Sequence, residues 1–241
     1  SGANRVQLLK EPTVAAVTRK KISIVDLVKI HTEAAITDYH AQRVYPTLRR
    51  FIGNTTDPAL KDLLQEADKW SREGGYRRDT DGDGYLEHGP AIVLLDSFWT
   101  LLVKNAFTPL LGPEMLAGAG TTNNLPSLTP GPSDANAWVM KVVAGVQAHL
   151  DPSRESPQNN YCGKTEAACR ELILDSFAEA VFSNTEKYGD VTTMWRVPET
   201  CDAGCRQITF SPTGDMMPVE PISWQNRGTY IQVTTGEQAP P

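Results

Sequence analysis

Apolar residues recur at intervals of three and four through most of the first hundred residues, which is the spacing of amphipathic helices. Ser23, with Asp26 three positions later, forms a capping-box pattern at the start of one such segment. Asp57 followed by Pro58 marks another start, because aspartate is a good N-cap and proline suits the first helical position. The pattern therefore predicts a series of helices joined by short turns.

The apolar faces of these predicted helices fall into four groups. They are Ile24, Leu27, Val28, His31 and Ala35; then Val44, Leu48, Phe51 and Ile52; then Leu60, Leu63, Leu64, Ala67 and Trp70; and last Leu94, Leu95, Phe98 and Leu102. We expect the second helix to end near Gly53, and the fourth to begin at Pro90 and end around Phe107. Helical spacing returns at Trp138, and a last helix is expected over residues 165–183.

Two stretches depart from this helical pattern. Residues 108–132 are rich in Pro, Gly, Thr and Asn, which predicts a long irregular excursion. Beyond residue 190, the runs 206–211 and 228–235 resemble short strands, and such strands need a sheet supplied by other segments. The predicted fold class is mainly α with a few short C-terminal strands. The expected regions are 1–107 (helices with an acidic loop), 108–132 (the excursion), 133–190 (helices with cysteines) and 191–241 (the short-strand tail).

The acidic loop at residues 79–90, DTDGDGYLEHGP, matches most of an EF-hand-type calcium loop. Gly84 stands at the sharp-turn position 6, but Pro90 stands at position 12, where a calcium sensor needs a bidentate Glu. A structural calcium ion joining two helices is one interpretation, and a metal-free turn is the other. The candidate ligands are Asp79, Asp81 and Asp83 at positions 1, 3 and 5, the Tyr85 carbonyl at position 7 and Glu87 at position 9.

The composition limits the kinds of partner that the protein is expected to bind. The formal charge is −6 and the isoelectric point is near 5.3, so a nucleic-acid partner is not expected. The longest apolar stretch, residues 91–103, is broken by Asp96 and is too short for a bilayer, so no membrane span is expected. The opening residues lack the pattern of a signal peptide and are already close to an amphipathic helix, which suggests either a cloning remnant or a processed fragment.

Four cysteines lie in the last third of the chain: Cys162, Cys169, Cys201 and Cys205. Four cysteines permit three disulfide connectivities, and pairing within each close pair is the simplest. Zinc binding and free thiols are the alternatives, although neither gap has the two-residue spacing of most structural zinc sites. Disulfides would indicate an oxidising, extracytoplasmic location, either periplasmic or secreted.

No group of residues in the sequence clearly predicts covalent catalysis. Ser1 has a free α-amine that can serve as its own base, but the residues after it do not form the buried strand that such a nucleophile needs. The four histidines are too far apart in the sequence to form a metal-binding pair at helical spacing; His88 adjoins the acidic loop and is a candidate to support its ligands. We therefore assign no catalytic residue.

Three segments resemble the penicillin acylase (penicillin amidase) family. Residues 224–233, WQNRGTYIQV, are similar to the closing segment of that family, and residues 74–99 resemble its Asp- and Gly-rich loop with the helix that follows. The helices leading into the loop are similar as well, at Arg5, Leu8, Leu9, Ser23, Asp26, Arg43, Pro46 and Leu48. The excursion and the cysteine segments are not part of this common pattern.

The resemblance implies a part of an N-terminal-nucleophile hydrolase, an αββα enzyme cut from a precursor into α and β chains. The nucleophile of that family begins the β chain, so this chain would be the C-terminal part of a β chain and would lack it. Its expected partners are the α chain and the N-terminal part of the β chain, and the parent would hydrolyse a small amide. A non-catalytic, calcium-stabilised helical binding module is the alternative, and a hydrolase using Ser1 is a third hypothesis.

Overall fold

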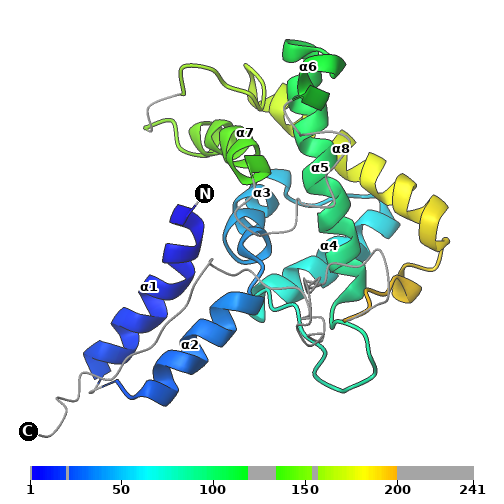
Figure 1. Cartoon of the computed structure of the whole chain (residues 1–241). Helices are drawn as coiled ribbons and strands as arrows, with labels where there is room; N and C mark the ends of the chain where they lie inside the picture. Colours follow the sequence, from blue (N-terminus) through cyan, green and yellow to red (C-terminus); the bar gives the residue numbers. More distant parts are fainter. Residues whose placement is uncertain (1, 20–21, 119–133, 154–156, 200–241) are drawn as a thin grey trace, which may run out of the picture.

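The computed structural model describes residues 2–19, 22–118, 134–153 and 157–199, and this part of the chain is mainly α-helical (Figure 1). It contains no β-strand among the described residues, only two isolated bridges, Thr37 with Tyr76 and Tyr85 with Pro198. The helices are α1 (Gly2–Arg19), α2 (Ile24–Ile36), α3 (Tyr45–Ile52), α4 (Pro58–Arg72), α5 (Gly89–Leu111), α6 (Pro113–Gly118), α7 (Asp134–Leu150) and α8 (Glu166–Tyr188). A π-helical turn, η1 (His40–Val44), precedes α3, and a 3₁₀ turn, η3 (Thr192–Met194), follows α8.

The predicted helix starts are confirmed by their hydrogen bonds. The Ser23 hydroxyl accepts the amide of Asp26, and the Asp26 carboxylate accepts the amide of Ser23, so the capping box of α2 is complete. The Asp57 carboxylate caps α4 by accepting the amide of Leu60 at 3.0 Å. These local signals work because they satisfy amide groups that a helix start leaves without partners.

Helix α5 is the core of the body, with α4, α7 and α8 packed around it (Figure 1). The rings of Phe98 on α5 and Phe177 on α8 stack with their centroids 3.7 Å apart. Buried side chains lie on every side of α5, which explains why its sequence is apolar nearly throughout. At 23 residues α5 is long and apolar enough to span a bilayer, but most of it is covered by the other helices.

Residues 108–118 differ from the expected irregular excursion. Helix α5 continues four residues past Phe107 and includes Pro109, and α6 follows directly after Gly112. The predicted boundary at residue 107 therefore falls inside a helix. The expected strand runs 206–211 and 228–235 lie outside the described residues, as do residues 119–133.

A buried ion triad holds the end of α2, the segment after α4 and α5 together. The Arg77 guanidinium donates to the Asp38 carboxylate at 2.7 Å and to the Asp96 carboxylate at 2.5 Å. Burial alone would lower the pKa of Arg77, but the charges of Asp96 and Asp38 raise it above its ordinary value. A backbone hydrogen bond links the same two segments, since the Arg77 amide donates to the Ile36 carbonyl at 2.8 Å.

His40 is buried beside this triad without a hydrogen-bond partner for either ring nitrogen. Its ring lies 5.0 Å from the Trp99 ring, whose Nε1 also lacks a partner. Desolvation lowers the pKa of His40 to about 4, although the charge of Asp38 opposes that shift. His40 is therefore neutral in the folded protein at neutral pH.

Replacing Arg77 with methionine will strongly destabilise the fold, because it removes the guanidinium that both Asp38 and Asp96 pair with. We expect a loss of about 3–5 kcal/mol in the free energy of unfolding, measured by urea titration. The neighbouring Arg78→Met is the control: Arg78 is exposed, so its loss should cost less than about 1 kcal/mol. Equal losses in the two variants would contradict a central role for the triad.

Acid will destabilise the protein through His40. Since its pKa is lower in the folded chain, near 4, than the ordinary 6.5, the unfolded chain binds more protons between these values and stability falls as the pH drops. At pH 5 this amounts to about 2 kcal/mol relative to neutral pH. We expect the His40→Leu variant to lose most of the change in the free energy of unfolding between pH 7 and pH 5. The His31→Leu variant should retain that change. Chemical denaturation at the two pH values tests this, and an unchanged pH dependence in His40→Leu would show the assignment to be wrong.

Candidate functional site

The acidic loop joins α4 to α5 through a series of short turns. Gly82 and Gly84 have positive φ angles of 77° and 85°, which glycine adopts at little cost. The Asp79 carboxylate accepts the amides of Gly82 at 2.7 Å and Gly84 at 2.8 Å. Partial desolvation raises the pKa of Asp79, but the amides of Gly84 and Gly82 outweigh it and lower the pKa below its ordinary value. Asp79 is thus held as a carboxylate.

The loop brings three of the five candidate ligands together. One carboxylate oxygen from each of Asp79, Asp81 and Glu87 lies within 4.8 Å of the others. Hydrogen bonds from the Thr80 side chain and amide lower the pKa of Glu87. Three carboxylates at this separation match the oxygen ligands that a hard divalent cation takes.

Asp83 points to a different partner. Its carboxylate lies 3.3 Å from Nη1 of Arg196, and the Arg196 guanidinium lies 4.8 Å from the centre of the Tyr85 ring. Arg196 belongs to the segment after α8, which crosses the loop: Leu86 donates its amide to the Val197 carbonyl at 2.8 Å, and Glu199 donates to Gly84 at 3.0 Å. This crossing segment was not apparent from the sequence, because nothing near residue 196 indicates an acidic partner more than a hundred positions earlier.

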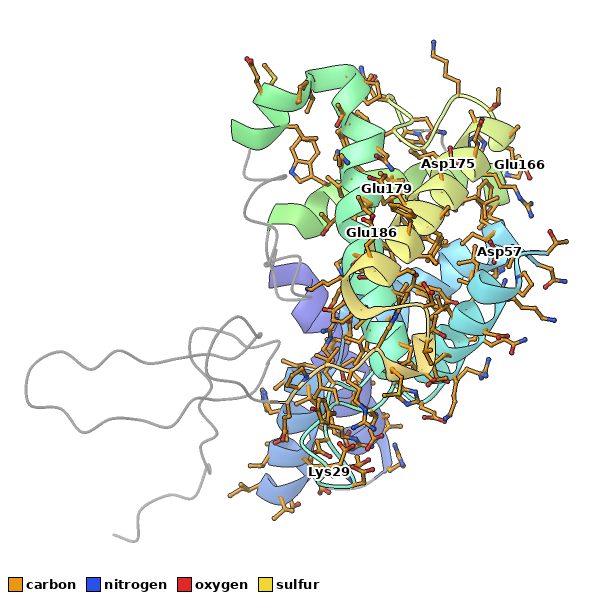
Figure 2. All side chains as sticks on the ribbon, turned by 90° about the vertical axis from the view of Figure 1, so that its right-hand side faces the viewer. Lys29, Asp57, Glu166, Asp175, Glu179 and Glu186 are labelled. Carbon is orange, nitrogen blue, oxygen red and sulfur yellow. A yellow bond between two sulfur atoms is a disulfide. The ribbon has the colours of Figure 1, made fainter. Side chains whose placement is uncertain are left out.

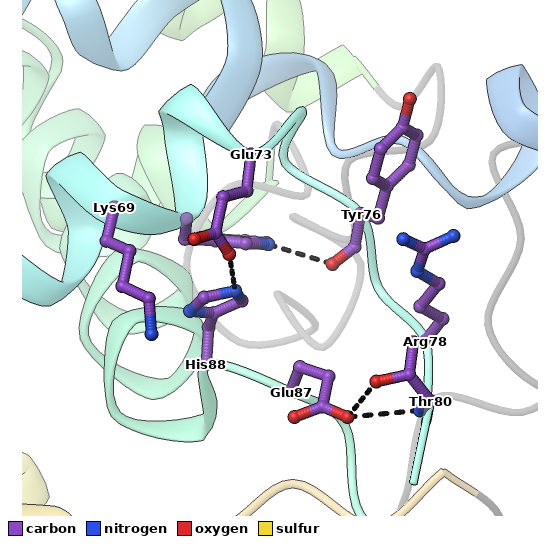
Figure 3. Close-up of a pocket in the computed structure, with 8 residues that line it drawn as sticks. Lys69, Glu73, Tyr76, Arg78, Thr80, Glu87 and His88 are labelled. Carbon is purple, nitrogen blue, oxygen red and sulfur yellow. Dashed lines mark hydrogen bonds and ion pairs between the residues drawn. The ribbon is translucent and has the colours of Figure 1, made fainter.

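A pocket of about 220 Å³ lies beside the loop (Figure 3). His88 stands at its edge between two carboxylates, with Nδ1 2.8 Å from Glu66 and Nε2 2.8 Å from Glu73. Its backbone is left-handed, with φ 58°, a conformation uncommon outside glycine. The lining residues are Lys69, Trp70, Glu73, Tyr76, Arg78, Thr80, Glu87 and His88.

The polar groups of this pocket are mostly engaged with one another. Both nitrogens of His88 face carboxylates, so neither is directed at a hydroxyl to act as a general base. The Thr80 hydroxyl donates to Glu87, and Trp70 donates its Nε1 proton to the Tyr76 carbonyl at 2.8 Å. This arrangement fits a joint between α4 and α5 better than a reactive site.

The first pair of cysteines forms a bridge. Cys162 and Cys169 are both buried, and they join the start of α8 to the loop before it. This is the local pairing that the spacing favours. Cys201, Cys205 and Ser1 lie outside the described residues.

Comparison with known proteins gives three findings. The sequence model of a family described as penicillin amidase matches residues 2–239. The fold is similar to that of a thermostable penicillin G acylase from Alcaligenes faecalis solved in an orthorhombic form, with a TM-score of 0.61 and 21% sequence identity. That likeness covers 93% of this chain and 39% of the acylase chain. No curated protein sequence matches the chain significantly.

Proposed function

Because the chain belongs to the penicillin amidase family, we propose that it is the C-terminal part of an enzyme that hydrolyses carboxylic amide bonds. The observation that carries the proposal is the family match over residues 2–239, nearly the full length of the chain. The chain spans about two fifths of the penicillin G acylase chain whose fold it shares. A part of this size would work together with a larger one.

In this proposal the chain is scaffold and the reaction takes place elsewhere in the parent enzyme. The family resemblance implies a nucleophile at the start of the β chain, ahead of the region that this sequence resembles. The paired groups around His88 support the same view, since they brace two helices and present no activated hydroxyl. The amide would be the side chain of a β-lactam, an acyl-homoserine lactone or a lipopeptide.

The partners of the chain would be the α chain and the N-terminal part of the β chain of the same precursor. The bridge between Cys162 and Cys169 supports an oxidising compartment, because such bridges are rare where thiols are kept reduced. We therefore propose a periplasmic or secreted location.

The chain alone should not hydrolyse a chromogenic phenylacetyl amide, and activity should appear when it is co-expressed with the segment that precedes it in its gene. The reason is that the nucleophile would belong to that segment. Release of the chromophore measures the activity of the chain alone and the activity of the co-expressed segments. Ser1→Ala is the control and should leave the combined activity unchanged. Turnover by the chain alone that disappears in Ser1→Ala would overturn the proposal in favour of a hydrolase that uses Ser1.

For the acidic loop we propose a structural calcium ion held by Asp79, Asp81 and Glu87. Their carboxylate oxygens converge from the two ends of the loop, so one ion would hold the end of α4 to the start of α5. Arg196 supports the same loop from outside through Asp83. The ion would have a structural role. The alternative hypothesis of a calcium-stabilised helical binding module requires the same role.

Chelation of calcium should lower the melting temperature of the wild-type chain by several degrees, because a ligand that binds only the folded state stabilises it. Asp81→Asn should melt at the chelated temperature with or without calcium. Asp62→Asn, an exposed aspartate on α4 outside the cluster, should respond to calcium as the wild type does. Identical melting curves for the wild type with calcium and with chelator would rule out the site.

A further inference from the structure

Helices α1 and α2 form a hairpin that lies apart from the helices around α5 (Figure 1). Figure 2 shows the same separation, since Lys29 of α2 and Glu166 of α8 are labelled toward opposite ends of the molecule. Among the described side chains of α1 and α2, only Leu8 and Ile30 are buried. A unit that buries so little apolar surface can separate from the body at a lower free energy than global unfolding requires.

The link between α2 and η1, residues 37–39, attaches this hairpin to the body. The Asp38 amide donates to the Gly75 carbonyl at 2.7 Å, and the Arg77 amide donates to the Ile36 carbonyl at 2.8 Å. The buried ion pair of Asp38 with Arg77 joins the same two segments. Opening of the chain at this link would therefore release the hairpin from the body.

His40 follows the link directly and begins the π-helical turn η1. Its side chain is fully buried 5.0 Å from the Trp99 ring, and neither ring nitrogen has a hydrogen-bond partner among the described residues. An imidazolium in this position would carry two N–H donors and a charge into a site that offers no acceptor. Burial accordingly lowers the pKa of His40 to about 4, so the closed chain excludes the proton at neutral pH.

The charged groups that face His40 are already engaged with one another. The Asp38 carboxylate accepts the Ala41 amide at 3.0 Å through one oxygen and the Arg77 guanidinium at 2.7 Å through the other. Arg77 also donates to the Asp96 carboxylate of α5. The charges of Asp38 and Asp96 favour the imidazolium and that of Arg77 opposes it, but desolvation outweighs them all.

The other elements packed against η1 carry charges that are also paired. Helices α3 and α4 contact η1, and Arg49 of α3 pairs with Asp68 of α4 at 3.1 Å. On the side of the hairpin, Arg43 of η1 pairs with Glu11 of α1. A proton on His40 is therefore accommodated by moving the chain around it, since these pairs would otherwise have to break.

We propose that residues 37–44, the link together with η1, form an acid-released latch: protonation of His40 opens it and frees the α1–α2 hairpin while the helices around α5 stay folded. His40 takes up the proton in the open form, where its ring reaches water. The opening is reversible, because it involves proton binding and no covalent change. The latch does not depend on the function proposed above, since every contact that forms it lies within this chain.

Hydrogen exchange of the complete 241-residue chain at pH 7 and pH 5 tests the latch. The amides of Asp38, Ala41, Gln42 and Arg77 report on it, because their hydrogen bonds lie within the latch or hold it to the body. At pH 7 these amides should be less protected than those of α5. From pH 7 to pH 5 their protection factors, corrected for intrinsic exchange, should fall about 20-fold, because the pKa of His40 changes from near 4 in the closed chain to the ordinary 6.5 on opening.

Two variants remove the titrating group. In His40→Leu and in His40→Phe the fall in protection between pH 7 and pH 5 should disappear, and the Phe variant keeps a ring that can lie against Trp99 if the Leu variant does not fold. His31→Leu, on α2 outside the latch, is the matched control and should retain the fall. The comparison of latch amides with α5 amides in the wild type needs neither variant.

Three results would overturn the latch. Latch amides that are as strongly protected as those of α5 at both pH values would mean that the chain opens only by global unfolding. Protection that is unchanged or higher at pH 5 would mean that protonation does not open the link. A fall in protection that persists in a folded His40 variant would assign the acid response to another group.

Discussion

The described fold depends most directly on one buried cation. Arg77 lies between Asp38 and Asp96 with its guanidinium almost fully enclosed; Asp38 comes from the link between α2 and η1, and Asp96 comes from α5. A charge in that position is tolerated only while both partners are present, because desolvation is costly without them. The hydrogen bonds of the Arg77 guanidinium therefore fix where the chain passes between α4 and the acidic loop. The cation also lies over the Trp70 ring, 5.6 Å from its centre, which links it to α4 as well.

The acidic loop begins two residues after this cation, and it is held from the other side by the segment that follows α8. Trp195 is buried, and its carbonyl approaches Gly89 so closely that a Cβ atom there would lie 2.5 Å from the oxygen. A glycine is thus required at the start of α5 for the segment to pass. From this position the next residue, Arg196, reaches Asp83. The loop is therefore clamped on one side by the segment after α8, and three of its acids, Asp79, Asp81 and Glu87, converge on one another.

Such a clamped loop suits a scaffold. The histidine beside it lies between Glu66 and Glu73, and the long apolar helix after it packs against α4, α6, α7 and α8. In the function proposed above, this helical body would support a catalytic part without taking part in the reaction. Among the described residues, the α1–α2 hairpin carries several of the exposed large apolar side chains, including Val25. Rigidity at the centre and apolar exposure at one edge are what a component of a larger assembly needs.

The sequence by itself determined the helices, their capped starts and the family. Ser23, Asp57 and Thr165 act on amides three residues away, so their effect is local and can be predicted from spacing alone. The sequence also indicated the acidic loop, whose turns depend on neighbouring Asp and Gly residues. The sequence did not indicate that α5 continues to Leu111 or that a further helix follows Gly112, because the packing of these helices outweighs the weak local preference of a Pro- and Gly-rich stretch. Only the tertiary structure decided that Arg77 is buried with two acids, that His40 is buried without a hydrogen-bond partner, and that Asp83 pairs with Arg196. Each of these depends on segments that are distant in sequence, and residue spacing carries no information about which distant charges will meet.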